Sequence, residues 1–164
     1  MNMIFFDTEF LDHGDRIELL SIGMVKPDRS TYYAEPLECN IFKANEWVRK
    51  NVIPLLDAPE KKTRLQIRDE IENWCGRNPI FWTYFGAYDW VALCQLFGTM
   101  MDLPSHTMGW PMFNMDIQQL RMMIHPGIPL PPHKGRQHHA LDDAIWTMES
   151  YEYLMKFART ANDP

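Results

Sequence analysis

The sequence has few cysteines, no excess of basic residues and no long hydrophobic run. Its three cysteines, Cys39, Cys75 and Cys94, are odd in number and far apart, which argues against a disulfide framework and a paired-cysteine zinc site. No apolar stretch approaches the ~18–20 residues that a membrane-spanning helix needs. A secretory signal would need a basic segment before its apolar residues, and none precedes the first apolar residues here. We therefore expect a soluble cytoplasmic protein with buried free thiols and no membrane partner.

The charge balance is acidic, with 16 Lys and Arg against 22 Asp and Glu and a net charge of −6. This balance argues against a domain that holds nucleic acid by net charge alone. It does not exclude an enzyme that gathers carboxylates around metal ions, because the ions reverse the local sign. The 13% of aromatic residues argue against disorder. A length of 164 residues without repeats suits one domain over residues 1–164.

Apolar residues recur with the periods of an α/β protein. Strands are expected over residues 2–6, 17–25, 31–34, 79–84 and 112–115. Helices are expected over residues 46–56, from Thr63 to about Cys75, and over 87–97, 117–124 and about 139–160. The residues from Pro27 to Ser30 suit a tight turn, and strands joined by such a turn run antiparallel. The pattern predicts one mixed β-sheet with helices on its faces.

The first candidate site is Asp7-Thr8-Glu9, which follows the apolar residues 2–6. Alternate residues of a strand point to the same face, so Asp7 and Glu9 are expected side by side. Two neighbouring carboxylates at a strand end suit a hard cation such as Mg²⁺ or Mn²⁺. The alternative interpretation is a chance Asp-x-Glu that merely ends a strand.

A second acidic residue, Asp89, lies in the first turn of the helix expected over residues 87–97. The rest of this helix is largely apolar, so an acid there is unusual for a segment that only packs in the core. Asp89 could bind a ligand, or it could complement the partial positive charge at the helix N-terminus. The sequence alone favours neither interpretation.

A third candidate site lies at the start of the last expected helix. Asp143 shares one helix face with three small residues, Ala140, Ala144 and Thr147. A stripe of small residues lets a helix approach a sheet closely, which would bring Asp143 towards the strand ends. Asp142 falls on another face, and we expect it, with His139, to belong to a solvated helix start.

Together these sites resemble the DEDDh 3′–5′ exonucleases of the ribonuclease H-like superfamily. The resemblance rests on the Asp7/Glu9 pair, on Asp89, and on the pattern His-x-Ala-x-x-Asp, which is complete at His138, Ala140 and Asp143. The segments FFDTEF, IELLSIGMV, GAYDWVALCQLFG and HHALDDA are similar to those of the small mycobacterial-type 3′–5′ exoribonucleases. The resemblance implies the ribonuclease H-like fold, a mixed β-sheet flanked by helices.

The resemblance also implies a reaction, the release of 5′-mononucleotides from single-stranded RNA 3′ ends or overhangs. Two divalent ions, Mg²⁺ or Mn²⁺, would be held by Asp7, Glu9, Asp89 and Asp143, and His138 would be the general base. Electrostatics agrees with this assignment. Two carboxylates about 4 Å apart repel by roughly 4 kcal/mol at an effective dielectric of about 20, so converging acids need cations or protons.

Four residues near these motifs are candidates for binding the substrate. Phe10 and Tyr88 are expected to contact a base or a sugar, because aromatic stacking commonly holds single-stranded ends. Lys134 and Arg136 precede His138 and could hold phosphate, with a solvated loop as the equal alternative. Trp82, Tyr84 and Phe85 are expected mostly in the core.

Other interpretations stay open from the sequence. The same site could act on DNA as a 3′–5′ exodeoxyribonuclease, or on nucleotides and very short oligomers as a phosphoesterase. A non-catalytic nucleic-acid-binding module is a further alternative, although it has no need for all four acids and the histidine. His133, His138 and His139 could bind zinc, but no fourth ligand has suitable spacing. A homodimer is also expected, since related small exonucleases are often dimers.

Overall fold

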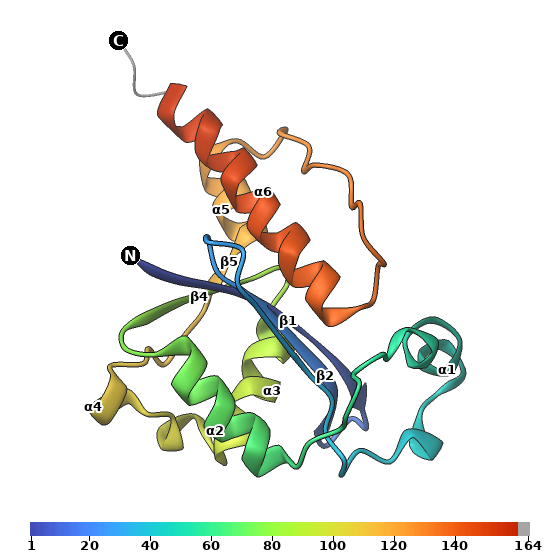
Figure 1. Cartoon of the computed structure of the whole chain (residues 1–164). Helices are drawn as coiled ribbons and strands as arrows, with labels where there is room; N and C mark the ends of the chain where they lie inside the picture. The colour runs from blue at the N-terminus through green and yellow to red at the C-terminus, as the bar shows by residue number, and fades with distance from the viewer. Residues whose placement is uncertain (161–164) are drawn as a thin grey trace.

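A computed structural model describes residues 1–160, and its centre is a five-stranded mixed sheet (Figure 1). The strands are β1 (Asn2–Asp12), β2 (Ile17–Val25), β3 (Thr31–Ala34), β4 (Pro79–Thr83) and β5 (Met115–Asp116). Their order is β3-β2-β1-β4-β5. The pairs β1–β2 and β2–β3 are antiparallel, whereas β1–β4 and β4–β5 are parallel. The mixed sheet predicted from the sequence is confirmed.

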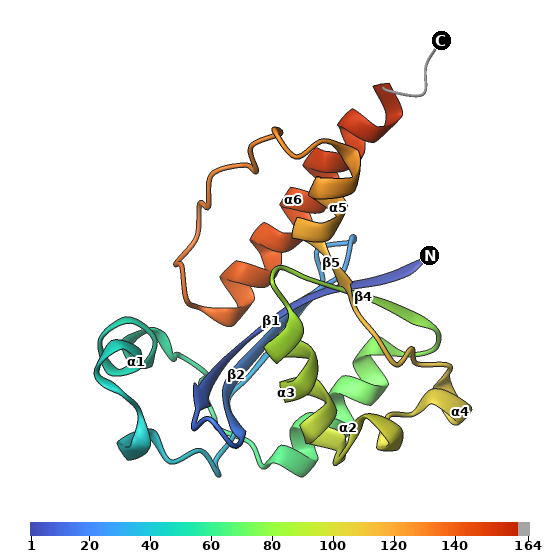
Figure 2. The same cartoon turned by 180° about the vertical axis from the view of Figure 1, so that it is seen from behind.

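Helices cover both faces of this sheet (Figures 1 and 2). The α-helices are α1 (Glu46–Asn51), α2 (Arg64–Cys75), α3 (Ala87–Phe97), α4 (Ser105–Met108), α5 (Ile117–Ile124) and α6 (Ala140–Thr160). Short 3₁₀ helices are η1 (Ile41–Lys43), η2 (Ile53–Leu55) and η3 (Met100–Asp102). Buried side chains of α2 and α3 pack on one face of the sheet and those of α5 and α6 on the other.

β1 divides the core because its side chains alternate between the two faces. Ile4 and Phe6 are fully buried among residues of α2 and α3. Phe5 points the other way and packs with residues of α5 and α6. The same alternation directs Asp7 and Glu9 to the side of α6.

The α1 arm, residues 41–57, lies beside the far end of the β1–β2 hairpin (Figure 1). A separate cluster of buried side chains attaches it: Leu11, Leu20, Ala44, Val48 and Val52. Asn45 caps α1 by accepting a hydrogen bond from the Val48 N–H at 2.9 Å. The arm therefore has its own apolar attachment next to the acidic end of β1.

Two element boundaries on the N-terminal half differ from the predictions. β1 continues to Asp12 instead of ending at residue 6, because β2 pairs with it as far as Asp12 opposite Ile17. Asp7 and Glu9 therefore lie within a strand rather than at its end. The helix predicted over 46–56 ends at Asn51 and η2 follows, since Pro54 has no N–H to continue an α-helix.

The strand predicted over residues 112–115 is also displaced. Only Met115 and Asp116 pair with β4, opposite Trp82 and Thr83. The side chain of Asp116 accepts a hydrogen bond from the Gln119 N–H at 3.0 Å and so begins α5. The helix predicted over 117–124 is therefore confirmed, while its preceding strand is shorter than expected.

The expectation of buried free thiols is met in part. Cys75 and Cys94 are buried free thiols, whereas Cys39 is only half-buried. Over residues 1–160, none of the helices combines the length and the apolar character that crossing a membrane demands.

Candidate active site

Asp7 and Glu9 lie where β1 loses its parallel neighbour. β4 pairs with β1 only from Asn2 to Phe5, and the chain leaves the sheet after Thr83 to form α3. The edge of β1 beyond Phe5 is therefore not paired with β4. Both carboxylates are partly buried at this edge.

The first turn of α3 brings Asp89 to the same edge. The Asp89 side chain is buried, and its Oδ1 accepts hydrogen bonds from the Thr8 N–H at 2.8 Å and the Thr8 hydroxyl at 2.6 Å. Thr8 separates Asp7 from Glu9 in β1. These two bonds therefore hold the start of α3 against the acidic part of the strand.

The start of α6 brings Asp143 over β1 because the helix approaches β2 closely. Gly23 pairs with Asp7 in the β1–β2 ladder, and the backbone of α6 at Ala140 and Leu141 occupies the space that a side chain at Gly23 would need. Ala140 is fully buried there. The close approach predicted from the stripe of small residues is confirmed.

His138 lies immediately before α6. Its N–H donates to Asp143 Oδ2 at 2.9 Å, and its backbone has a φ of +70°. Its ring makes an edge-to-face contact with Trp47 of the α1 arm, with centroids 4.9 Å apart. Ligand atoms of Glu9, His138 and Asp143 all lie within 4.8 Å of one another. This trio is a candidate metal-binding group.

The four carboxylates destabilise one another's ionised forms. Burial, together with repulsion from the other acids, raises the pKa of Asp7 well above its usual value. Burial and then repulsion from Asp143 and Asp89 raise the pKa of Glu9 to about 8. Burial also raises the pKa of Asp89 to about 6, against the effect of its Thr8 hydrogen bonds, and raises that of Asp143. Such a cluster favours bound protons or cations over full ionisation.

A pocket of about 330 Å³ opens beside these acids. Its lining includes Asp7, Tyr84, His133, His138, Asp143 and Trp146. Tyr84 meets Trp146 edge to face at 4.8 Å, so one wall of the pocket is aromatic. The expectation that Tyr84 and Phe85 lie in the core is wrong: Tyr84 is half-buried in this wall, and Phe85 is 65% exposed.

Comparison with known proteins identifies the family. Residues 2–155 match the Rv2179c-like 3′–5′ exoribonuclease domain. The chain is 41% identical over 148 residues to the 3′–5′ exoribonuclease Rv2179c of Mycobacterium tuberculosis strain H37Rv, with 85% of each chain covered. The 3′–5′ exoribonuclease MT2234.1 of strain CDC 1551 matches equally. The chain belongs to the Rv2179c-like family. It is a 3′–5′ exonuclease, a phosphodiester hydrolase.

Solved structures of exonuclease I have a similar fold. One matches with a TM-score of 0.63 at 11% identity, over 98% of this chain and 44% of the other. Escherichia coli exonuclease I in complex with a dT13 oligonucleotide matches with a TM-score of 0.60 at 13% identity. The chain spans less than half the length of exonuclease I, and this likeness shows the fold alone. The predicted ribonuclease H-like exonuclease fold is confirmed.

His133 is a neighbour of the acids that the sequence suggested only as a zinc ligand. Its Nε2 lies 2.6 Å from Asp143 Oδ1, and its Nδ1 lies 3.1 Å from the Gly135 carbonyl oxygen. No spacing rule links a residue in this proline-rich connector to Asp143, so this contact could not be predicted from local patterns. His139 faces elsewhere, so the structure does not bring His133, His138 and His139 to one zinc site.

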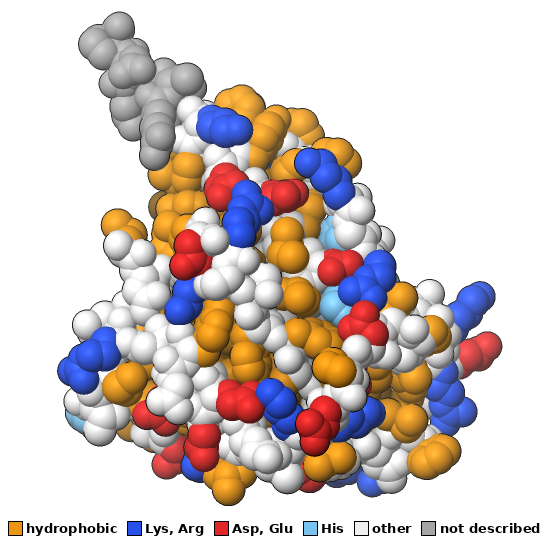
Figure 3. All heavy atoms as spheres, viewed as in Figure 1, with side chains coloured by type: hydrophobic (Ala, Val, Ile, Leu, Met, Phe, Trp, Pro, Cys, Tyr) orange, Lys and Arg blue, Asp and Glu red, His pale blue; other side chains and the backbone are white. Residues whose placement is uncertain are grey.

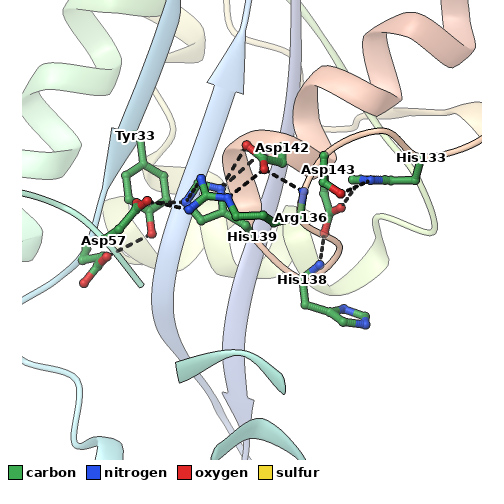
Figure 4. Close-up of polar contacts among 10 residues, drawn as sticks. Tyr33, Asp57, His133, Arg136, His138, His139, Asp142 and Asp143 are labelled. Carbon is green, nitrogen blue, oxygen red and sulfur yellow. Dashed lines mark hydrogen bonds and ion pairs between the residues drawn. The ribbon is translucent and has the colours of Figure 1, made fainter. Parts of the chain in front are cut away.

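His139 and Asp142 form a polar network rather than the solvated helix start that was expected (Figure 4). The expectation is wrong for His139, which is 2% exposed and stacks on Tyr33 with centroids 4.7 Å apart. Asp142 accepts hydrogen bonds from Arg136. Asp57 completes this network. Hydrogen bonds from Arg136 and then from His139 hold the pKa of Asp57 below its usual value.

The two basic candidates for holding phosphate do not face the four acids. The Arg136 guanidinium contacts Asp57 and Asp142 and points away from Asp143 (Figure 4). Lys134 is exposed and lines a separate hollow of about 140 Å³ beside Asp142. The aromatic candidates do meet: Phe10 stacks on Tyr88 with centroids 5.6 Å apart.

Proposed function

We propose that this exonuclease removes nucleotides from the 3′ ends of single-stranded RNA and releases 5′-mononucleotides. The observation that carries the proposal is the convergence of four carboxylates, those of Asp7, Glu9, Asp89 and Asp143, beside His138. RNA is favoured over DNA because the relatives at 41% identity are named exoribonucleases.

The donor set fits divalent cations. Carboxylate oxygens are the ligands that Mg²⁺ and Mn²⁺ prefer. The pKa of Glu9 is raised to about 8 by burial and by its acidic neighbours, so a nearby positive charge would stabilise its ionised form. We assign the four acids to two divalent ions, which when bound orient the attacking water and stabilise the leaving 3′ oxygen.

His138 is the general base in this proposal and takes a proton from the attacking water. Its main chain is held by Asp143, while its ring lies at the pocket and makes an edge-to-face contact with Trp47. Imidazole is the side chain that most often acts as a general base in enzymes. The zinc alternative has no support, because the three histidines do not converge.

In this proposal the substrate is held by stacking and by the attraction of its phosphates to the divalent ions at the acidic site, rather than by a basic patch. Tyr88 is 51% exposed and stacks on Phe10. In the sequence Tyr88 precedes Asp89 and Phe10 follows Glu9, so the pair offers a surface for a base near the acids. On the face seen in Figure 3, acidic and basic side chains are interspersed. This surface agrees with the net charge of −6.

The test is a gel of 5′-labelled single-stranded RNA and DNA oligomers of matched sequence, incubated with Mg²⁺ or Mn²⁺. We expect a ladder that shortens from the 3′ end, faster on RNA, and lost with EDTA or in Asp7→Ala and Asp143→Ala. His138→Ala should retain a small residual rate. Asp15→Ala is the matched control, because Asp15 is a solvent-exposed acid on the β1–β2 hairpin with its side chain 76% exposed.

Intact oligomers under every metal, with binding still seen by gel shift, would reject the enzyme and leave a nucleic-acid-binding module. A faster ladder on DNA would assign an exodeoxyribonuclease. Wild-type activity in Asp143→Ala would move its role to another acid.

A further inference from the structure

The His138 loop, residues 133–139, is anchored on both sides of His138 (Figure 4). Before His138, Asp142 Oδ2 accepts the main-chain N–H of Arg136 at 2.8 Å and its Nε at 3.0 Å. After His138, the buried ring of His139 packs against β3. The ring of His138 is directed away from these partners (Figure 4).

Asp57 joins the two anchors. Its Oδ2 accepts a hydrogen bond from Arg136 Nη1 at 2.6 Å, and its Oδ1 lies 3.0 Å from His139 Nε2. His139 Nε2 also lies 3.2 Å from Arg136 Nη2, so the carboxylate, the guanidinium and the imidazole meet at one place. One carboxylate therefore holds both residues that flank the His138 segment.

The conformation of His138 requires support from its surroundings. Its φ of +70° is one that residues other than glycine rarely adopt, and such conformations persist where neighbouring contacts impose them. Asp57 also belongs to the α1 arm, which carries Trp47 against the His138 ring. Asp57 therefore contacts a residue on each side of His138 and belongs to the arm that carries the aromatic side chain beside its ring.

We propose that Asp57 and Arg136 are positioning residues that hold His138 in place for the exonuclease reaction. The inference rests on the proposed function, in which His138 acts on the attacking water. The Arg136 guanidinium is shared by two carboxylates, those of Asp57 and Asp142, so it is committed to this network and not to substrate phosphate. A misplacement of about 1 Å at a reacting group can lower a rate on the order of 100-fold.

The test compares Asp57→Ala, Arg136→Ala and the double variant in RNA shortening, with kcat and KM measured separately. We expect each single variant to lower kcat by about tenfold or more and to leave KM within about twofold of wild type. The double variant should be no slower than the slower single variant, because both changes break the same contact. Arg29→Ala is the matched control: Arg29 pairs with Glu152 at 3.1 Å, its side chain is 52% exposed against 45% for Arg136, and it should have no effect.

The opposite pattern would overturn the inference. If Arg136 held phosphate, Arg136→Ala would raise KM, and Asp57→Ala would free the guanidinium and tighten RNA binding. Losses that add in the double variant would also contradict a shared positioning role.

A measurement that does not depend on catalysis, amide hydrogen exchange, separates this inference from the proposed function. Wild-type protein that leaves RNA intact would reject the proposed function alone. Exchange of the His138 amide hydrogen, measured by NMR, should be slow in wild type because of its bond to Asp143. It should become faster in Asp57→Ala and Arg136→Ala but not in Arg29→Ala. Unchanged exchange in both Asp57→Ala and Arg136→Ala would overturn the inference.

Discussion

Thr8 donates two hydrogen bonds to one oxygen of Asp89, from its hydroxyl at 2.6 Å and from its N–H at 2.8 Å. Both bonds favour the ionised carboxylate and oppose burial, which raises the pKa of Asp89 to about 6. Thr8, which separates Asp7 from Glu9 in β1, thus holds Asp89 of α3 in place. This contact explains how three carboxylates from two elements stand together.

Thr8→Val should reduce both stability and activity. Valine matches threonine in shape but removes the hydroxyl, and a hydrogen bond to a charged group contributes about 1.5–3 kcal/mol. We expect a loss of free energy of unfolding in this range and a lower kcat. Thr8→Ser, which keeps the hydroxyl, is the control in urea unfolding and RNA shortening. Equal stability and activity of the two variants would contradict the role of this bond.

The metal-free protein should become less stable as pH rises from about 6 to about 8, above the range in which acids of ordinary pKa titrate. The folded-state pKa of Glu9 is about 8 against an ordinary 4.5, and that of Asp89 is about 6 against 3.8. Because both values are raised, the folded state binds more protons than the unfolded state in this window, and stability falls as these protons are lost. Thermal unfolding in EDTA across the window checks the direction.

Mn²⁺ or Mg²⁺ should reverse this trend, because a cation stabilises the ionised cluster and binds only the folded state. The rise in Tm on adding metal should be larger at about pH 8 than at about pH 5. Glu9→Gln removes one titrating group and should flatten the dependence in EDTA. A Tm that stays constant or rises with pH in the metal-free wild type would contradict the raised pKa values.

Local sequence rules anticipate most of the acidic cluster. The period of a strand places Asp7 beside Glu9, and the stripe of small residues brings Asp143 to the sheet. The helix expected over 87–97 is present with the same bounds, so Asp89 lies in its first turn as predicted. These features depend on residues close together in the sequence.

Long-range contacts account for what the sequence did not indicate. His139 was expected to be solvated, but it is buried because its partners, Tyr33 and Asp57, come from β3 and the α1 arm. Asp57 is 82 positions from His139 and 79 from Arg136. No periodicity or spacing connects such residues, and only the packed fold brings them together.

Gly23→Ala should displace α6 from the sheet. An added methyl group would collide with the main chain at Ala140 and Leu141, which cannot move aside as a side chain can. Overpacking typically costs about 1–3 kcal/mol, and the shift would separate Asp143 from Asp7. We expect a lower Tm and a marked loss of activity. Gly127→Ala, where the methyl group meets only the His125 side chain, is the control and should change neither. Full activity in Gly23→Ala would contradict the need for this close approach.

Tyr88→Ala should weaken the binding of single-stranded RNA without removing the reaction. Its ring is 51% exposed and stacked on Phe10, and a base stacked on an aromatic side chain contributes about 1–3 kcal/mol. We therefore expect KM to rise by about fivefold to 150-fold, with a smaller change in kcat. Phe113→Ala is the control, because Phe113 is 62% exposed and lines an apolar hollow beside β4 and β5. If both variants raise KM equally, the effect comes from general loss of exposed aromatic surface and not from a base held at Tyr88.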